Sequence, residues 1–177
     1  MPNFLEGLPK EKIQLLYILN AARAELTMQQ FYQCAFECTG MNWFSFHDVV
    51  GELEKNGDIV CERRPFGTCA FLTDQGKATL SLFEKGLTYS LREGIDQYLK
   101  QNAPQFRQEK ELVSSEEALP GGGMLVRLKA LEGDRPLLEI DLSVASLEES
   151  LRIRKNWQRC SAELYDTIYD TLIGKER

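Results

Sequence analysis

Residues 27–72 read TMQQFYQCAFECTGMNWFSFHDVVGELEKNGDIVCERRPFGTCAFL, and this stretch decides the fold. Thr27 and Gln30 have the spacing of a capping box, in which two side chains satisfy backbone N–H groups at the start of a helix. The helix that follows is expected to end at the turn Thr39-Gly40-Met41-Asn42. The stretch therefore begins with a capped helix and a tight turn.

A second helix and two short strands follow this turn. The second helix is expected to open at Ser45, to bury Phe46, Val49, Val50 and Leu53, and to end at Asn56-Gly57, because glycine accepts the left-handed conformation of a C-cap. Residues 59–64 and 68–72 are extended in type and flank Pro65-Phe66-Gly67, so they predict a hairpin. Helix, turn, helix and hairpin in this order predict a winged helix-turn-helix, with the second helix in the recognition position.

The predicted DNA-binding residues are the outward-facing positions of this second helix and two wing arginines. Arg63 and Arg64 are placed to meet phosphates or a minor groove. The predicted helix positions are Ser45, His47, Asp48, Gly51, Glu52 and Lys55. These residues predict a DNA-binding transcriptional regulator.

The charge of the same helix supports an alternative function. It carries Asp48, Glu52 and Glu54 against the single cation Lys55, so its own field opposes a phosphate backbone. The alternative is a winged-helix module that docks a protein partner and does not bind DNA.

The rest of the first half is predicted to be helical. Pro9 is placed in the first turn of the opening helix, and residues 13–22 are apolar almost all round, which is typical of a helix in the middle of a core. Thr73 is predicted to cap one further helix, and Ser90-Leu91-Arg92-Glu93 to cap another that ends at Asn102-Ala103-Pro104. These two helices carry more apolar surface than a minimal winged helix needs, so a homodimer is expected.

The pattern changes after Phe106. Residues 106–112 are expected to form a polar strand, followed by a loop over residues 114–123. Residues 124–131 and 137–143 alternate between apolar and charged side chains, which predicts a hairpin with one apolar face and one face of paired opposite charges. A last helix capped by Ser146 carries an apolar stripe that fits the hairpin: Ile153, Trp157, Cys160, Leu164, Ile168 and Leu172.

The predicted class is therefore α+β, a winged helix-turn-helix followed by a small antiparallel β-hairpin or sheet packed on a long C-terminal helix. Residues 1–102 are assigned to the first domain, and residues 103–177 to a small α+β unit. A basic run on the last helix, Arg152, Arg154, Lys155 and Arg159, is interpreted as a solvated face, with nucleic-acid contact as the alternative.

Charge and composition narrow the function classes. Residues 1–80 carry 7 basic and 10 acidic side chains, and residues 102–177 carry 11 and 14, so neither part is a basic nucleic-acid-binding domain. No apolar run reaches membrane-spanning length, and Met1-Pro2-Asn3-Phe4 does not begin a signal peptide, so a cytoplasmic protein without a membrane partner is expected.

Catalysis and cofactors are not predicted. His47 is the single histidine and belongs to no nucleophile motif, so the chain is not expected to be an enzyme. Four cysteines, Cys34, Cys38, Cys61 and Cys69, have no Cys-x-x-Cys spacing and are interpreted as small buried hydrophobes, with a metal or redox site as the alternative. No cofactor or metal is assigned.

Several motifs together resemble a known family. They are Leu16-Tyr17-Ile18-Leu19, Leu53-Glu54-Lys55-Asn56-Gly57-Asp58-Ile59, Thr73-Asp74-Gln75-Gly76, Leu82-Phe83-Glu84-Lys85 and Ser90-Leu91-Arg92-Glu93-Gly94-Ile95-Asp96. With them the chain resembles, over most of its length, an uncharacterised bacterial domain-of-unknown-function family of winged-helix proteins. The resemblance implies a winged-helix fold and a regulatory role, and supplies no ligand or activity.

Overall fold

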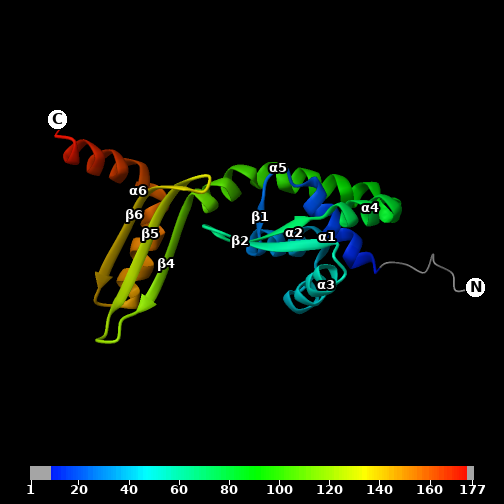
Figure 1. Cartoon of the computed structure of the whole chain (residues 1–177), viewed down its shortest axis with the longest axis horizontal. Helices are drawn as coiled ribbons and strands as arrows, with labels where there is room; N and C mark the ends of the chain where they lie inside the picture. The colour runs from blue at the N-terminus through cyan, green and yellow to red at the C-terminus, as the bar shows by residue number, and fades with distance from the viewer. Residues whose placement is uncertain (1–8, 175–177) are drawn as a thin grey trace, which may run out of the picture. The chain divides into compact units, whose positions relative to one another are not determined.

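The computed structural model describes residues 9–174, so the expectation about a signal peptide at Met1-Pro2-Asn3-Phe4 lies outside the described residues. The chain divides into two compact units, Met1–Phe106 and Arg107–Arg177. The described residues form six α-helices, one short 3-10 helix and two three-stranded antiparallel sheets (Figure 1). The class is α+β, as predicted.

The first unit is built around one buried helix. Leu15, Leu16 and Ile18 of this helix are completely buried, which confirms that it lies in the core. The small sheet has the order β1-β3-β2. The elements up to the end of this sheet are α1 (Lys10–Ala21), β1 (Leu26–Thr27), α2 (Met28–Thr39), α3 (Trp43–Lys55), β2 (Ile59–Arg64) and β3 (Gly67–Leu72).

Local capping explains where α2 begins and ends. The Thr27 hydroxyl accepts from the Gln30 N–H at 3.2 Å, and the Gln30 side chain accepts from the Thr27 N–H at 3.2 Å. Gly40 follows the helix in the left-handed conformation, with φ 72°. The predicted capping box and turn are both confirmed.

Helix α3 begins earlier than predicted. Asn42 is its N-cap, and the Asn42 side-chain oxygen accepts from the Ser45 N–H at 3.0 Å. The prediction that the helix opens at Ser45 was wrong because Asn42, three residues earlier, is as good a capping residue as serine and its side chain caps the helix first. Trp43 and Phe44 consequently belong to the first helical turn.

The next helix is fastened to the turn that follows α3. Helix α4 (Asp74–Phe83) is capped by Thr73, as predicted, and the Thr73 hydroxyl accepts from the Gly76 N–H at 3.0 Å. The Thr73 N–H also donates to the Asp58 carbonyl at 3.1 Å. A side chain at Gly76 would overlap that carbonyl, so this close approach requires glycine.

Helix α5 (Tyr89–Glu111) follows a 3-10 turn, Glu84–Gly86, and differs from the prediction at both ends. At its start the Thr88 hydroxyl accepts from the Leu91 N–H at 3.3 Å, so Thr88 and not Ser90 is the cap. At its end the helix continues through Pro104, where it was predicted to stop. Phe106 is buried in the core of the first unit, and its carbonyl accepts from the Gln30 amide at 3.0 Å. Residues 106–111 are therefore helix and not the predicted strand.

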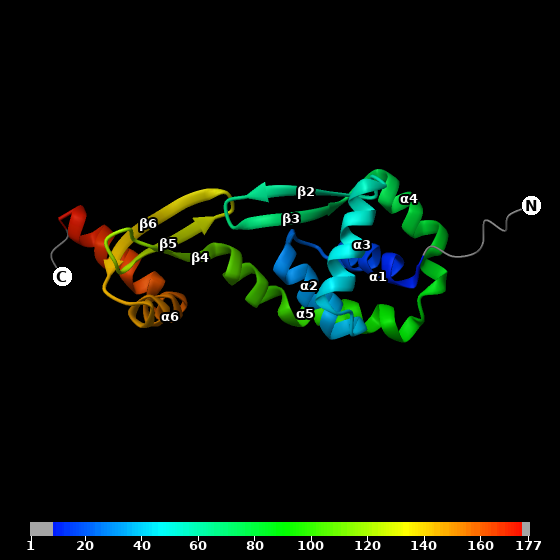
Figure 2. The same cartoon turned by 90° about the horizontal axis from the view of Figure 1, so that it is seen from below.

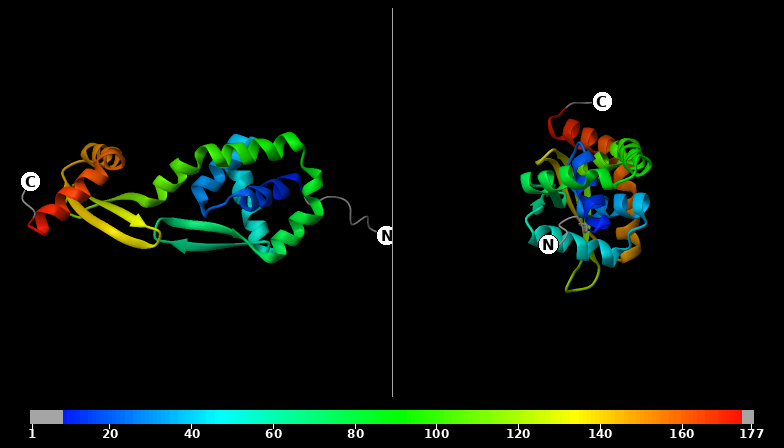
Figure 3. Two further views of the ribbon diagram at one scale, coloured as in Figure 1. Left: turned by 90° about the horizontal axis from the view of Figure 1, so that it is seen from above. Right: turned by 90° about the vertical axis from the view of Figure 1, so that its right-hand side faces the viewer.

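The second unit is a three-stranded sheet covered on one face by a long helix (Figure 3). Its elements are β4 (Leu112–Ala118), β5 (Met124–Glu132), β6 (Arg135–Val144) and α6 (Leu147–Leu172), in the sheet order β4-β5-β6. The predicted hairpin and the span of the last helix are confirmed, but Cys160 and Leu172, predicted to belong to the buried stripe of this helix, are exposed. Residues 114–118, predicted as loop, form a strand paired with β5. Trp157 is buried against Val126 and Leu128 of β5.

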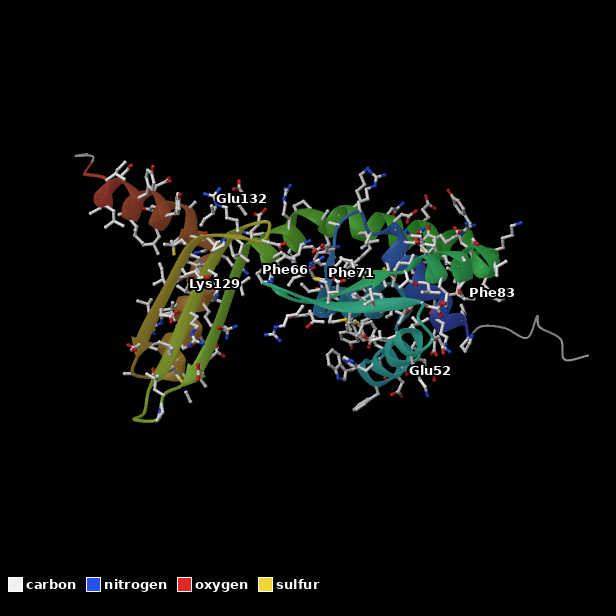
Figure 4. The ribbon with its side chains drawn as sticks, viewed as in Figure 1. Glu52, Phe66, Phe71, Phe83, Lys129 and Glu132 are labelled. Carbon is white, nitrogen blue, oxygen red and sulfur yellow. The ribbon has the colours of Figure 1, made fainter. Side chains whose placement is uncertain are left out.

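The opposite face of this sheet carries charge pairs. Arg127 lies 3.3 Å from Glu117 and 3.4 Å from Asp141, and Lys129, labelled in Figure 4, lies 3.0 Å from Glu139. This confirms the predicted pairing of opposite charges across the strands.

The basic run on α6 is partly engaged within the second unit. Arg154 bonds to Glu116 and to the Ser114 hydroxyl of β4, and Arg152 pairs with Glu148 one turn earlier. Arg154 therefore fixes the polar strand β4 to the helix.

Candidate interaction surface on α3 and the β2–β3 hairpin

Helix α3 is held to the first unit along one side only. Phe46 and Leu53 are completely buried, and Val49 and Val50 lie beside them. The helix lies on the side of the first unit away from α5, as Figures 1 and 2 agree. Its other side faces solvent.

Four residues form the centre of this solvent-facing side. At 100° per residue, Phe44, Asp48, Gly51 and Lys55 lie along a line opposite Phe46 and Leu53. All four are exposed, and Phe44 has 81% of its surface accessible. We call these four residues the α3 stripe. The predicted Asp48, Gly51 and Lys55 all belong to it.

Phe44 is the residue that the sequence interpretation missed. Placing the helix start at Ser45 put this phenylalanine in the preceding turn, although the Asn42 side chain makes it helical. With the N-cap placed at Asn42, Phe44 lies at helical spacing from Asp48 and Gly51, and this spacing is the signal that identifies it as a residue of the same face.

His47 and Ser45 lie beside the stripe. The His47 ring packs edge-on against Trp43, with ring centroids 4.1 Å apart, and against Phe46 at 5.4 Å. Ser45 is half-buried, and its N–H is engaged by Asn42. These two predicted residues contribute mainly to the helix and its aromatic neighbours.

Glu52 lies on the other flank and is neutralised by a lysine of α1. The Lys12 ammonium is 2.7 Å from the Glu52 carboxylate, and only 12% of the lysine side chain is exposed. Figure 4 shows Glu52 on α3. The ion pair removes one of the three acidic charges that the sequence assigns to this helix.

The hairpin places its two arginines in different environments. Arg64 pairs with Glu25 at 3.1 Å and with Glu62 at 3.4 Å, and its guanidinium lies 5.0 Å from the centre of the Phe71 ring. Arg63 is one residue further than Arg64 from the tip of the hairpin and is exposed. Phe66 marks this tip in Figure 4. Arg64 is therefore held by Glu25, which precedes β1, and by Glu62 and Phe71 of its own hairpin, whereas Arg63 projects into solvent.

Cys34 and Cys69 are buried, and Cys38 and Cys61 are half-buried. Burial raises the pKa of Cys34 to about 12 and that of Cys38 to about 11, and burial together with the nearby Glu54 carboxylate raises the pKa of Cys61 to about 11. Cys61 lies opposite Ala70 in the hairpin, whereas Cys69 lies opposite Glu62, so the two thiols point to opposite faces of the sheet. Among residues 9–174, no group of three or more His, Cys, Asp or Glu side chains is placed to hold a metal ion.

Within the described part of the chain, no helix combines the length and apolar character needed to cross a bilayer. No curated protein and no solved structure matches the sequence. A family model described as "Domain of unknown function (DUF4364)" matches residues 11–172, which is nearly the whole chain and includes both units. The chain belongs to the DUF4364 family.

Proposed function

We propose that residues 10–72 form a winged helix-turn-helix and that the protein is a DNA-binding transcriptional regulator. The observation that carries this proposal is the chain order α1, β1, α2, α3, β2, β3 together with the sheet order β1-β3-β2. In this arrangement α3 is packed against the unit along one side only, so the α3 stripe and the hairpin tip are exposed. A helix presented in this way has the shape that enters a major groove, with a hairpin beside it to contact the backbone. Such a regulator acts in the cytoplasm, where reducing conditions keep thiols free.

Each residue of the α3 stripe has its own proposed role in binding DNA. Phe44 offers an apolar contact for a thymine methyl group, and Asp48 accepts from a cytosine amino group. Gly51 lets the helix approach the base edges closely because it has no side chain. Lys55 and Arg63 are assigned to phosphates.

Few phosphate contacts imply weak salt dependence. With Lys55 and Arg63 as the phosphate-binding cations, each protomer should contribute about −1.8 to the log-log slope of affinity against salt, since each contact contributes about −0.9. Most of the discrimination must then come from the base contacts of Phe44 and Asp48.

We also propose a homodimer, which would present two α3 helices to two half-sites. Leu80, Leu87, Ile95 and Leu99 of the α4–α5 region are used in the core of the first unit. Leu82 and Tyr89 remain largely exposed there and are the residues available to a second copy. Sedimentation at micromolar concentration should give the mass of a dimer, and Leu82→Ser with Tyr89→Ser should shift it to that of a monomer; a monomer at every concentration would remove this part of the proposal.

Selection from a random duplex library tests DNA binding without a known operator. The full-length protein should enrich one sequence motif, and Phe44→Ala should change or abolish that motif. Arg63→Ala should weaken binding to all duplexes and reduce the slope by about 0.9. Arg135→Ala is the matched control, because Arg135 is an exposed hairpin arginine of the second unit.

The second candidate function is a protein-docking module without DNA binding. It is favoured by the acidic residues of α3, of which Asp48 belongs to the stripe and Glu54 lies beside it. Failure to enrich any duplex at low salt, where attraction to phosphate is least screened, would decide for this candidate.

A further inference from the structure

Helix α6 carries a row of apolar side chains that the sheet of the second unit does not cover. Leu147 and Leu151 in its first turns are 52% and 51% exposed, and Tyr169 and Leu172 near its end are 50% and 80% exposed. Tyr165, one turn before Tyr169, stacks on the Tyr169 ring with the two centroids 6.0 Å apart. We call these five residues the outer row of α6.

The outer row follows one side of the helix. Tyr165 and Leu172 come two and three heptads after Leu151, and each heptad returns to nearly the same side of an α-helix. Trp157, which packs on the sheet, lies about 90° around the helix from this row. The C-terminal part of α6 also turns away from the sheet, as Figures 1 and 2 agree. The outer row therefore faces solvent.

Four charged residues border the outer row in a fixed order. The cations Lys155 and Arg159 come first along the helix, and the anions Glu163 and Asp166 follow. All four are exposed and lie within about 80° of one another on the side of α6 away from the sheet. Lys155 and Asp166 adjoin the row directly, because each has a member of the row one helical turn away. Within residues 9–174 none of the four is paired with an opposite charge.

This order of charges is complementary to itself when two copies of the helix run in opposite directions. Reversal about the middle of the run brings Lys155 of one copy opposite Asp166 of the other, and Arg159 opposite Glu163. It also brings the apolar residues at one end of the outer row opposite those at the other end. A parallel pair would instead place each charge opposite itself, which is unfavourable. The charges therefore favour a second copy of α6, in antiparallel orientation, as the occupant of this side.

We propose that α6 pairs with the α6 of a second copy of this chain, antiparallel, through the outer row and its four bordering charges. The contact is isologous, so one twofold axis relates the two copies. Gln158 interrupts the outer row, and a polar residue between paired helices weakens their association, so the pairing is expected at hundreds of micromolar. DNA binding plays no part in it, because all of its residues belong to the second unit. Together with the homodimer proposed above, it would join two dimers into a tetramer.

Sedimentation of the full-length protein over a range of concentrations tests the pairing. The mass should double between micromolar and several hundred micromolar, and added salt should raise the concentration at which it doubles. Leu82→Ser with Tyr89→Ser should leave this doubling in place, starting from the monomer, so the two interfaces succeed or fail separately. A mass that stays constant over the whole range would overturn the proposal.

Charge reversal tests the bordering residues. Lys155→Glu with Arg159→Glu makes all four positions acidic, and Glu163→Lys with Asp166→Lys makes them all basic, so neither variant alone should double its mass. An equimolar mixture of the two should regain the doubling. The variant with all four substitutions should regain it too, and is the matched control because its net charge is that of the wild type. Circular dichroism verifies that each variant folds. Doubling by either two-residue variant alone, or none in the mixture, would overturn the site.

Crosslinking tests the orientation of the two helices. In a Cys160→Ser background, Ala162→Cys places a thiol near the twofold axis, and Leu151→Cys places one near the end of the outer row. A short bismaleimide should link two copies of the Ala162→Cys variant. It should not link two copies of the Leu151→Cys variant, because antiparallel pairing separates these positions by roughly 30 Å of helix, at 1.5 Å per residue. Equal linkage of both variants would mean parallel helices and would overturn the proposal.

Discussion

Gly76 shows how one residue fixes the junction between α3, the sheet and α4. The Asp58 carbonyl accepts from Thr73 and lies against the Cα of Gly76, where an added Cβ would also meet Leu72. Because the obstacle is backbone, a neighbouring side chain cannot move to make room for it.

Replacing this glycine should therefore destabilise the protein. Gly76→Ala should lower the free energy of unfolding by about 1–3 kcal/mol, the usual cost of overpacking. Gly94→Ala is the control, because Gly94 is helical with open space around it and should gain up to about 1 kcal/mol from helix propensity. Urea denaturation measures both; a neutral Gly76→Ala would mean that the junction is looser than the contacts indicate.

The cysteine thiols give the stability a pH dependence at the alkaline end. The folded state holds the protons of Cys34, Cys38 and Cys61 up to about pH 11–12, whereas the unfolded thiols lose theirs near the ordinary pKa of 9.0. Above pH 9 the unfolded state binds fewer protons, so the free energy of unfolding decreases as pH rises through the folded pKa values.

Cys38→Ala tests this dependence at one position. The variant should lose stability less steeply than the wild type between pH 9 and about 11, since one raised pKa has been removed. Chemical denaturation at several pH values gives the slope. Cys160→Ala, which removes an exposed thiol, is the control for the loss of a cysteine side chain. Identical slopes for Cys38→Ala and the wild type would contradict the prediction.

Among the elements, α5 departs most from what its sequence favours. A proline inside a helix removes the bond to the carbonyl four residues earlier and crowds it. The helix nevertheless continues through Pro104 because Phe106 is buried in the core and its carbonyl receives the Gln30 amide. Tertiary contacts override the local signal.

Removing the proline should strengthen the helix. Pro104→Ala should raise the free energy of unfolding by up to about 3 kcal/mol, the difference in helix propensity between the two residues. Gln101→Ala, an exposed position one turn earlier, should change it little. Thermal unfolding measures the effect; a loss of stability would show that the packing of Phe106 needs the bend that proline imposes.

The elements that were predicted correctly are those with local signals. The caps at Thr27, Thr73 and Ser146 each involve a side chain and an N–H three residues ahead, so the sequence alone reveals them. Strand β4 has no such signal, because its polar residues become a strand through pairing with β5 and through the bonds of Arg154.

The candidate surface was predicted in part for the same reason. Asp48, Gly51 and Lys55 follow from helical spacing, which is local. Glu52 pairs with Lys12, and Arg64 pairs with Glu25. Both ion pairs join residues far apart in sequence, so no local sequence pattern could predict them.

At the scale of the whole molecule, the two units have separate hydrophobic cores. The hydrophobic cluster of the first unit ends at Phe106, and that of the second is centred on Val126, Leu128 and Trp157. No residue belongs to both cores. The units should therefore unfold in separate steps.

Calorimetry should resolve two transitions, which core substitutions would identify. Trp157→Ala should destabilise the second unit by about 3–5 kcal/mol, the usual cost of truncating a buried aromatic residue, and should lower one transition only. Gly76→Ala should lower the other. A single transition displaced by either substitution would show that the units unfold cooperatively.

The sequence Asn56-Gly57 at the end of α3 has a consequence for how the protein ages. In an asparagine followed by glycine, the glycine backbone nitrogen attacks the asparagine side-chain carbonyl carbon and expels ammonia, and water then opens the resulting cyclic imide to aspartate or isoaspartate. In the folded protein the Gly57 N–H donates to the Glu54 carbonyl at 3.0 Å, and the Asn56 carbonyl accepts from the Gln75 amide at 2.6 Å, so the backbone is held in place around the nitrogen that must attack. Folded protein stored at neutral pH should keep its asparagine, and protein stored in urea should acquire the mass of the aspartate form, so the chemistry of this one dipeptide records how long a sample has spent unfolded.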